Sequence, residues 1–126
     1  MQKPLAIIIE DHEDQAMVFS TALQVSGYET ETILDGAVAQ QRLKEIIPTL
    51  IILDLHLPYV SGDEILKQVR AEPRLSDVRV IIATADALMG ESLRGLADHV
   101  LLKPISFIQL KTLIQRIAEQ GDSTAD

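Results

Sequence analysis

The sequence predicts an α/β domain in which five strand–helix units form a doubly wound parallel sheet. Short apolar runs rich in Ile and Val alternate along the chain with longer segments whose apolar residues recur at helical spacing. Such alternation implies parallel strands, right-handed crossovers and helices on both faces of the sheet, and therefore three layers. With 126 residues, the chain is about half as long as a closed eight-stranded α/β barrel requires.

Four apolar runs have the length and composition of strands that are buried on both faces of a sheet. Residues 28–33 are β-prone, but their acidic residues alternate with others, which is typical of an exposed edge strand. The open, flavodoxin-like order 2-1-3-4-5 places this second strand at an edge. The expected buried strands are residues 5–9, 50–53, 80–83 and 100–102.

Helix start signals precede three of the segments between these strands. Asp35 is the expected N-cap of the second helix. Ser61 and Ser106 each open the spacing of a capping box, which predicts that the third and fifth helices begin there. The first two helices are expected at residues 13–26 and 36–47, and the fourth at residues 87–98.

Glycine and proline mark the expected helix ends. Gly27 ends the first helix, and Pro48 and Pro73 follow the second and third. Gly90 and Gly95 interrupt the fourth segment and cost about 1 kcal/mol each relative to Ala. This fourth helix is therefore expected to be the weakest of the five.

Composition limits the classes of function. The absence of cysteine excludes disulfides, cysteine-ligated metals and a thiol nucleophile. A net charge of −8 argues against direct binding to nucleic acid or to an anionic membrane surface. Neither a signal peptide nor a membrane span is visible, so a cytoplasmic protein is expected. Residues 1–120 are expected to form the domain, and residues 121–126 a polar C-terminal tail.

Polar and charged residues directly follow four of the predicted strands. Ligands of open parallel sheets bind beyond the carboxyl ends of the strands, so we expect these side chains to share one cleft. Taken singly, each is more typical of a helix cap, a turn or a solvated surface, and only their combination favours a site. The five residues are Glu10, Asp11, Asp54, Thr84 and Lys103.

This residue set is suited to phosphoryl transfer. Three neighbouring carboxylates repel one another unless a cation neutralises them, and Mg²⁺ prefers oxygen ligands. A lysine and a hydroxyl beside such a metal site suggest a bound phosphoryl group. Because an aspartate can attack phosphorus to form an aspartyl phosphate, Asp54 is the candidate nucleophile. Glu10 and Asp11 are the candidate metal ligands.

Four short motifs stand at these strand ends: Glu10-Asp11, Asp54 with Pro58 and Gly62 after it, Ala83-Thr84-Ala85, and Lys103-Pro104. Over roughly residues 4–120, the chain resembles the response regulator receiver domains (CheY-like) of two-component signalling.

The resemblance implies a role for each site residue. Asp54 would accept a phosphoryl group from a histidine kinase or a phosphotransfer protein. Mg²⁺ would be held by the three carboxylates together with the backbone carbonyl of His56. Thr84 would bind the phosphoryl group and move as a switch, and Lys103 would pair with its oxygens. The Lys103–Pro104 peptide bond is expected to be cis.

Some positions depart from the family pattern. Val100 stands where the family usually has the Tyr or Phe that moves with the threonine. Glu10 stands where Asp is more common. His56 and Asp86 occupy the positions that tune hydrolysis of the acyl phosphate in this family.

The expected function is that of a phosphorylation-activated signalling module that catalyses only its own phosphorylation and dephosphorylation. The face formed by segments 87–98, 100–102 and 106–117 is the expected surface for a downstream protein partner or a homodimer. Two alternatives remain open. Val100 favours a receiver that binds partners without phosphorylation. A haloacid-dehalogenase-type phosphatase would need an aspartate at His56.

Other residues carry simpler expectations. His12, His56 and His99 lack the spacing of transition-metal ligands and are expected to be exposed loop residues. Three apolar residues of the first helix are expected in the core: Met17, Phe19 and Leu23.

Overall fold

A computed structural model of the protein describes residues 2–124, and the side chains of residues 2–120. The strands are β1 (Leu5–Ile9), β2 (Glu29–Ile33), β3 (Leu50–Leu53), β4 (Arg79–Thr84) and β5 (His99–Leu102). The helices are α1 (Glu13–Val25), α2 (Gly36–Arg42), α3 (Gly62–Ala71), the short 3₁₀ helix η1 (Pro73–Leu75), α4 (Ala87–Ser92) and α5 (Phe107–Thr124).

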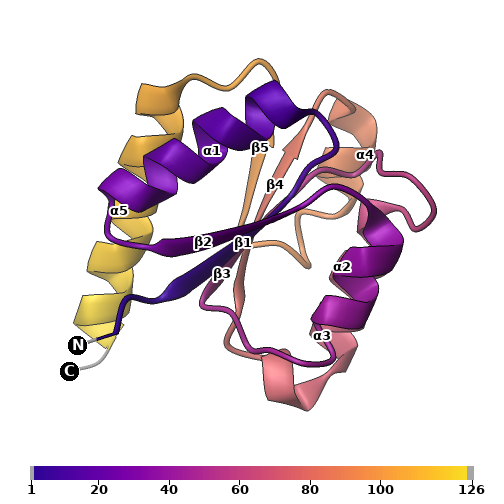
Figure 1. The fold of residues 1–126 in the computed structure, drawn as a ribbon, viewed down its shortest axis with the longest axis horizontal. Helices are drawn as coiled ribbons and strands as arrows, with labels where there is room; N and C mark the ends of the chain where they lie inside the picture. Colours follow the sequence, from indigo (N-terminus) through magenta and orange to yellow (C-terminus); the bar gives the residue numbers. More distant parts are fainter. Residues whose placement is uncertain (1, 125–126) are drawn as a thin grey trace.

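All strands are parallel and form one sheet in the order β2-β1-β3-β4-β5. Helices α1 and α5 cover one face, and α2, α3 and α4 lie on the other (Figure 1). The predicted fold class and strand order are confirmed. Within the part of the chain that the structure describes, no helix combines the length and apolarity needed to cross a membrane. Residues 125–126 of the predicted tail lie outside the described residues.

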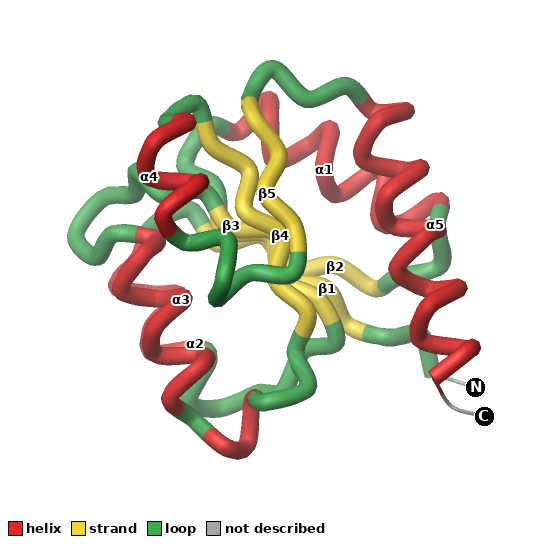
Figure 2. The backbone as a smooth tube through the Cα atoms, turned by 180° about the vertical axis from the view of Figure 1, so that it is seen from behind, coloured by secondary structure: helices red, strands yellow, loops and turns green. Residues whose placement is uncertain are grey.

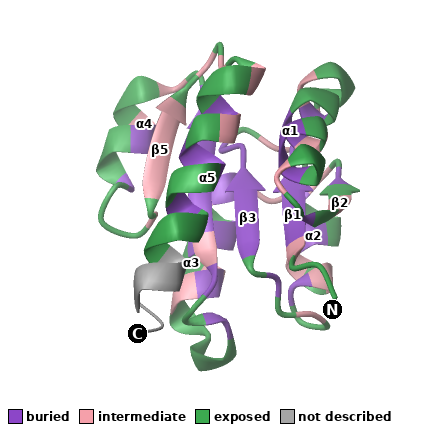
Figure 3. Cartoon of the chain, turned by 90° about the vertical axis from the view of Figure 1, so that its left-hand side faces the viewer, coloured by how far each residue is buried: buried purple, intermediate pink, exposed green. Residues whose placement is uncertain are grey.

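Two apolar clusters fill the space on either side of the sheet, because successive side chains of a strand point to opposite faces. Ile7 and Ile9 of β1 pack in one cluster with residues of α2 and α3. Ala6 and Ile8 pack in the other with residues of α1 and α5. The central strands β1 and β3 are buried on both faces (Figure 3). In α1, Phe19 lies in the core, as predicted.

Three of the sequence signals set helix ends as predicted. Gly27 follows α1 with a φ of 97°, a conformation that glycine adopts without steric cost. The carboxylate of Asp35 accepts a hydrogen bond from the backbone N–H of Val38 at 2.8 Å. The hydroxyl of Ser106 accepts one from the N–H of Gln109 at 3.0 Å. These bonds satisfy amides that would otherwise have no partner in the first turns of α2 and α5.

The third helix begins directly after Ser61, as predicted, but the predicted capping box is wrong, because its side-chain hydrogen bond is not formed. Ser61 makes no cap hydrogen bond with its side chain, and its hydroxyl donates instead to the carboxylate of Asp63. Asp63 and Glu64 place two negative charges in the first turn, where they interact favourably with the helix dipole.

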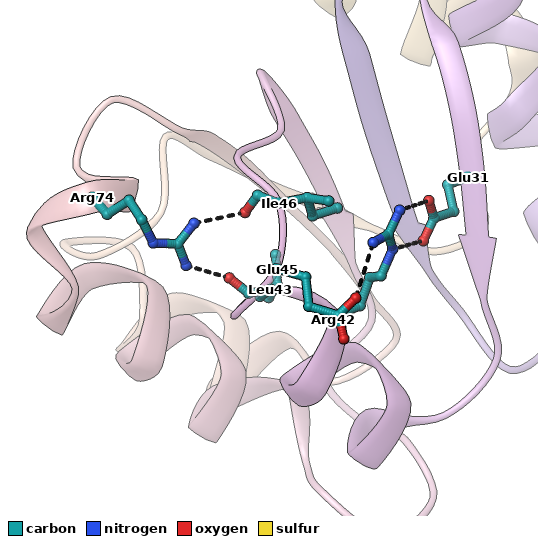
Figure 4. Close-up of polar contacts among 6 residues, drawn as sticks. All are labelled: Glu31, Arg42, Leu43, Glu45, Ile46 and Arg74. Atoms are coloured by element: carbon teal, nitrogen blue, oxygen red, sulfur yellow. Dashed lines mark hydrogen bonds and ion pairs between the residues drawn. The ribbon is translucent and has the colours of Figure 1, made fainter.

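The second helix is shorter than predicted, because it ends at Arg42 instead of residue 47. Arg74 donates hydrogen bonds to the backbone oxygens of Leu43 and Ile46 (Figure 4). In a continuing helix, the oxygen of Leu43 would accept a hydrogen bond from the backbone N–H four residues later, but here it accepts one from Arg74. The guanidinium of Arg42 also binds both carboxylate oxygens of Glu31 in β2, at 2.8 and 3.0 Å. Side chains distant in sequence therefore fix where α2 stops.

The fourth helix is also shorter than predicted, ending at Ser92 instead of residue 98. The guanidinium of Arg70 donates to the backbone oxygen of Leu96 at 2.7 Å and to the carboxylate of Asp98 at 3.0 Å. Asp98 in turn accepts from the N–H of Val80 in β4 at 2.7 Å. These contacts hold the chain in the direction of β5 and prevent a further helical turn.

Two glycines allow close backbone contacts around the loop that joins β3 to α3. A Cβ atom on Gly62 would clash with the carbonyl oxygen of Asp54 and lie 2.7 Å from the Cα of Leu55. A Cβ atom on Gly36 would clash with the carbonyl oxygen of Val60. The amides of the two glycines also donate to carbonyls of this loop, at 2.9 and 3.0 Å. The loop that carries Asp54 is therefore fixed at both of its ends.

Replacing Gly62 with Ala should lower the free energy of unfolding by about 2 kcal/mol, because the new methyl group meets backbone that cannot move away easily. Gly95→Ala is the matched control, since nothing lies within 4 Å of a Cβ atom there. Urea denaturation of both variants measures the difference. Equal midpoints for Gly62→Ala and Gly95→Ala would show that the loop is not held at Gly62.

The pair between Glu31 and Arg42 should stabilise the fold only where Glu31 is ionised. Hydrogen bonds from Arg42 lower the pKa of Glu31 below its ordinary value of 4.5. A lowered pKa in the folded state gives stability that is present above the ordinary value and lost as the pH falls through the lowered one.

Both side chains are about one-third exposed. Glu31→Gln should therefore lower the free energy of unfolding by only about 0.5 kcal/mol at neutral pH. At about pH 3 it should cause no measurable change. Urea denaturation at both pH values tests this, with Glu29→Gln on the same strand as control. A cost that persists undiminished in acid would contradict the ion-pair explanation.

Candidate functional site

Three charged side chains meet at the carboxyl edge of the sheet, where β1, β3 and β5 end. The Nζ of Lys103 donates to Oε1 of Glu10 at 2.7 Å and lies 3.4 Å from Oδ2 of Asp54. The side chains of Glu10, Asp54 and Lys103 are only 1%, 6% and 11% exposed. Charges removed from water to this extent need close partners of opposite charge. The structure thus brings three of the five predicted site residues into direct contact.

Backbone hydrogen bonds place these residues by extending the strand pairing past the strand ends. The N–H of Glu10 donates to the oxygen of Ile33, and the N–H of Asp54 donates to the oxygen of Ile9, both at 3.0 Å. The N–H of Lys103 donates to the oxygen of Thr84 at 2.8 Å. The peptide bond between Lys103 and Pro104 is cis, as expected. The position of each charged group therefore follows from the register of the sheet.

The surroundings of the carboxyl group of Glu10 alter its pKa. Burial raises the pKa of Glu10, and the neighbouring charge of Asp54 raises it further. The ammonium of Lys103 and the backbone N–H of His12 oppose this shift by hydrogen bonding to the carboxylate. A cation near Glu10 and Asp54 offsets the repulsion between the two carboxylates.

Asp11 offers a buried carboxylate oxygen as a candidate ligand. Its Oδ1 has no hydrogen-bond partner among the described residues. Ligand atoms of Glu10, Asp11 and His12 lie within 4.8 Å of one another. An unpartnered buried carboxylate oxygen is costly unless an ion or water completes it. The oxygen-rich set of donors here fits a hard cation such as Mg²⁺.

The other predicted metal ligands lie beside this group. The carboxylate of Asp54 contacts Lys103 through Oδ2, and its Oδ1 accepts from the backbone N–H of His56 at 3.3 Å. His12, which sequence reasoning treated as an ordinary exposed loop residue, is exposed but contributes to the cluster. Its position directly after Glu10 and Asp11 is the signal that could have identified it.

Thr84 lies at the end of β4 and is fully buried. Its hydroxyl accepts a hydrogen bond from the N–H of Asp86 at 3.0 Å. A Cβ atom on Gly90 of α4 would lie 3.2 Å from the Cγ2 methyl of Thr84 and 3.0 Å from the Cγ1 methyl of Val100. Helix α4 therefore packs directly on the two predicted switch residues, with no aromatic ring between them.

A cavity of about 620 Å³ opens at this edge of the sheet, and Asp54 and Lys103 are among its lining residues. His56, also in the lining, binds Asp86 through Nε2 and Oδ2 at 3.0 Å. Hydrogen bonds from the N–H of Met89 and from His56 hold the pKa of Asp86 below its usual range. The two predicted hydrolysis-tuning residues are therefore paired with each other beside the cavity.

Sequence reasoning missed Asp14 and Gln15, which line the same cavity from the first turn of α1. The Oε1 atom of Gln15 is buried and has no hydrogen-bond partner among the described residues. The available signal is that this turn follows the acidic pair directly, so its side chains lie near the end of β1.

Comparison with known proteins relates this geometry to a family. The family model of the response regulator receiver domain matches residues 6–115. The phosphate regulon transcriptional regulatory protein PhoB of Rhizobium meliloti (strain 1021) is 36% identical over 121 residues, which are 94% of this chain and 53% of that protein. The chain thus spans about half the length of this relative. The polar-differentiation response regulator DivK of Brucella anthropi is 36% identical over 103 residues, which cover 79% of this chain and 84% of DivK.

Solved structures agree with this relationship. The bacteriophytochrome response regulator RtBRR superposes with a TM-score of 0.79 at 27% identity, covering 90% of this chain and 77% of that one. The chemotaxis response regulator CheY4 of Vibrio cholerae gives a TM-score of 0.83 at 24% identity, which shows a shared fold, and covers 92% and 99% of the two chains. The chain therefore belongs to the family of response regulator receiver domains, which act in two-component signalling.

Proposed function

We propose that this receiver domain is a phosphoacceptor whose acceptor residue is Asp54. The observation that carries the proposal is the contact of Lys103 with both Asp54 and Glu10 beside an open cavity. An ammonium within 3.4 Å of the acceptor carboxylate can also reach the oxygens of a phosphoryl group bound to it. The donor is the phosphohistidine of a sensor histidine kinase or of a phosphotransfer protein. The cytoplasm is the compartment that we propose for this exchange.

The transfer requires one bond to form and one to break. A carboxylate oxygen of Asp54 attacks phosphorus, and the bond between phosphorus and the donor's imidazole nitrogen breaks. The electron pair of that bond leaves with the nitrogen, which then takes up a proton. Lys103 Nζ donates to a phosphoryl oxygen, and the hydroxyl of Thr84 turns from the amide of Asp86 to donate to another. The domain thereby catalyses a reaction on itself and turns over no free substrate.

Glu10, Asp11, Asp54 and the backbone carbonyl of His56 are the groups that we propose to hold Mg²⁺. The unpartnered buried Oδ1 of Asp11 supports this assignment. When bound, the ion neutralises charge that the carboxylates and the phosphoryl oxygens share. Glu10 stays buried and close to Lys103, so the protein itself supplies part of that neutralisation.

The output of the domain is a change in partner binding on the face formed by α4, β5 and α5. Gly90 of α4 packs against Thr84 and Val100, so a change at Thr84 acts on α4 through direct contact. This contact takes the place of the aromatic residue that the family usually has at Val100. The proposed switch therefore depends on methyl-group packing and does not require the rotation of a ring.

Incubation with acetyl phosphate and Mg²⁺ should add one phosphoryl group to the chain, as measured by intact-protein mass spectrometry. Asp54→Asn should abolish the gain, because the amide is not a nucleophile for phosphorus. Asp77→Asn is the matched control. This exposed aspartate lies just before the amino end of β4, at the other end of the strands from Asp54, so the phosphoryl gain should persist.

A phosphoryl gain that survives in Asp54→Asn would show that another residue is the acceptor. Steady release of phosphate from free phosphomonoesters would instead identify a phosphatase. Partner binding unaffected by the phosphoryl group would identify a receiver that works without phosphorylation.

The pair between His56 and Asp86 should slow hydrolysis of the aspartyl phosphate. Its hydrogen bond engages Nε2 of the imidazole and leaves this nitrogen unable to act as a base on water. His56→Ala removes the pair but keeps the backbone carbonyl, so water gains access to Asp54. We expect dephosphorylation to become about threefold to tenfold faster, since excluded water protects reactive intermediates.

The measurement follows the loss of the phosphoryl mass with time in the wild type, in His56→Ala and in Tyr59→Ala. Tyr59 provides the control because it lies in the same loop as His56, is 88% exposed and does not line the cavity. Slower hydrolysis in His56→Ala would mean that the imidazole positions the attacking water.

A further inference from the structure

His12 brings an imidazole beside the carboxylates of Glu10 and Asp11. One ligand atom from each of these three residues lies within 4.8 Å of the other two. Ligand atoms about 2.1 Å from a shared ion lie up to about 4.2 Å apart, so a small rotation of the exposed imidazole completes the set. Figures 1 and 2 show the start of α1, which follows His12 directly, at the edge where the strands end. The cluster therefore offers a nitrogen ligand together with carboxylate oxygens.

The backbone of His12 is held on both sides. Its N–H donates to Oε2 of Glu10 at 3.2 Å, which ties that carboxylate to the peptide of His12. Its carbonyl oxygen accepts from the N–H of Ala16 at 2.9 Å. His12 is the N-cap residue of α1, but its side chain makes no cap hydrogen bond. The imidazole is therefore positioned by the backbone and is not needed to begin the helix.

Two groups of this cluster have no partner in the protein. Oδ1 of Asp11 is buried and accepts no hydrogen bond from any described residue. The imidazole of His12 makes no hydrogen bond or ion pair with the described residues. A carboxylate oxygen is an acceptor, and a neutral imidazole offers a nitrogen lone pair. A single cation satisfies both groups at once.

The other two histidines are placed differently. His56 lines the same cavity as His12, but its Nε2 is engaged by Oδ2 of Asp86 at 3.0 Å. His99 begins β5 and therefore lies at the other end of this strand from Lys103. Among the chain's three histidines, His12 is the one whose imidazole stands beside carboxylates of the metal cluster.

A nitrogen ligand changes the class of ion that a site prefers. Mg²⁺ takes oxygen ligands and keeps several of its waters, so it gains little from an imidazole. Zn²⁺ and other late first-row transition-metal ions bind imidazole well, and their affinity for mixed nitrogen and oxygen sites is higher. An imidazole next to Glu10 and Asp11 therefore favours such an ion over Mg²⁺.

We propose that His12 is a direct ligand of the bound metal and that it gives the site a preference for transition-metal ions such as Zn²⁺ over Mg²⁺. The inference rests on the proposed function, because Glu10 and Asp11 are also proposed there as ligands of Mg²⁺. It adds a nitrogen ligand and a second class of ion. The two carboxylates serve both kinds of ion, and the imidazole serves only the ion that accepts nitrogen.

The test titrates the tag-free chain with Zn²⁺ or with Mg²⁺ and follows the ring nitrogens of its three histidines by NMR. We expect one ring nitrogen of His12 to shift with Zn²⁺ and not with Mg²⁺. The ring of His56 provides the internal control, and its nitrogens should keep their positions. A ring nitrogen of His12 that does not respond to Zn²⁺, or a response of His56 in its place, would overturn the proposal.

Calorimetry measures how much the imidazole contributes to affinity. His12→Ala should weaken Zn²⁺ binding by about tenfold or more, since losing even an outer-shell partner of a metal ligand typically costs that much. Mg²⁺ binding should change far less. His12→Asn should behave in the same way, and because asparagine favours the N-cap position, its effect does not come from a loss of α1. Equal weakening of both ions would contradict a nitrogen ligand.

Aspartate variants locate the ion that His12 binds. Asp11→Asn should weaken Zn²⁺ binding and remove the shift of the His12 ring. Asp14→Asn is the matched control, because Asp14 is an exposed aspartate that lines the cavity but does not belong to the cluster. A His12 shift that persists in Asp11→Asn and disappears in Asp14→Asn would place the ion elsewhere and overturn the proposal.

Phosphoryl uptake from acetyl phosphate with Mg²⁺ separates this inference from the proposed function. A wild type that gains the phosphoryl group but whose His12 ring ignores Zn²⁺ overturns this inference and leaves the proposed function standing. A wild type that fails to gain the group contradicts the proposed function, and a shifted ring nitrogen would still identify His12 as a metal ligand.

Discussion

The contact of Lys103 with Glu10 and Asp54 is the interaction on which the rest of the site depends. These residues are separated by 93 and 49 positions along the chain, and only the parallel sheet brings them together. Removing one member of a buried ionic group leaves the others without a partner, typically at a cost of about 3–5 kcal/mol. The strand order, the sheet register and the glycine contacts of the β3–α3 loop all serve to keep these three groups within reach of one another.

The strands and the site edge could be predicted because their signals are local. The run from Leu50 to Leu53 is apolar at every position, which fixes it as a strand buried on both faces. Asp54 and Lys103 follow such runs directly, so topology alone places them at one edge. An isolated aspartate after a strand is usually a turn residue, so the roles of Asp54, Glu10 and Asp11 followed only from the combination of groups at this edge. The switch role of Thr84 and the metal-binding role of the His56 carbonyl came from the resemblance to a family.

The predictions that the structure contradicts concern places where contacts between distant residues decide the local structure. Arg74 and Arg70 bind backbone oxygens just beyond the ends of α2 and α4, and the sequences of these helices do not identify those distant partners. Met17 was expected in the core, but its side chain is 68% exposed, because α1 turns that position away from the sheet. His99 was expected in a loop, yet it begins β5 and is partly buried.

The division of the interior into two clusters has a consequence for how the domain can change. Neighbouring residues such as Ile7 and Ile8 belong to different clusters, so the two sides meet only through the backbone of the strands. Substitutions on opposite faces should therefore be nearly additive, within about 0.3–0.5 kcal/mol. Helices α2, α3 and α4 can accumulate new sequences without repacking α1 and α5. One face of the sheet is free to diversify while the other preserves the fold.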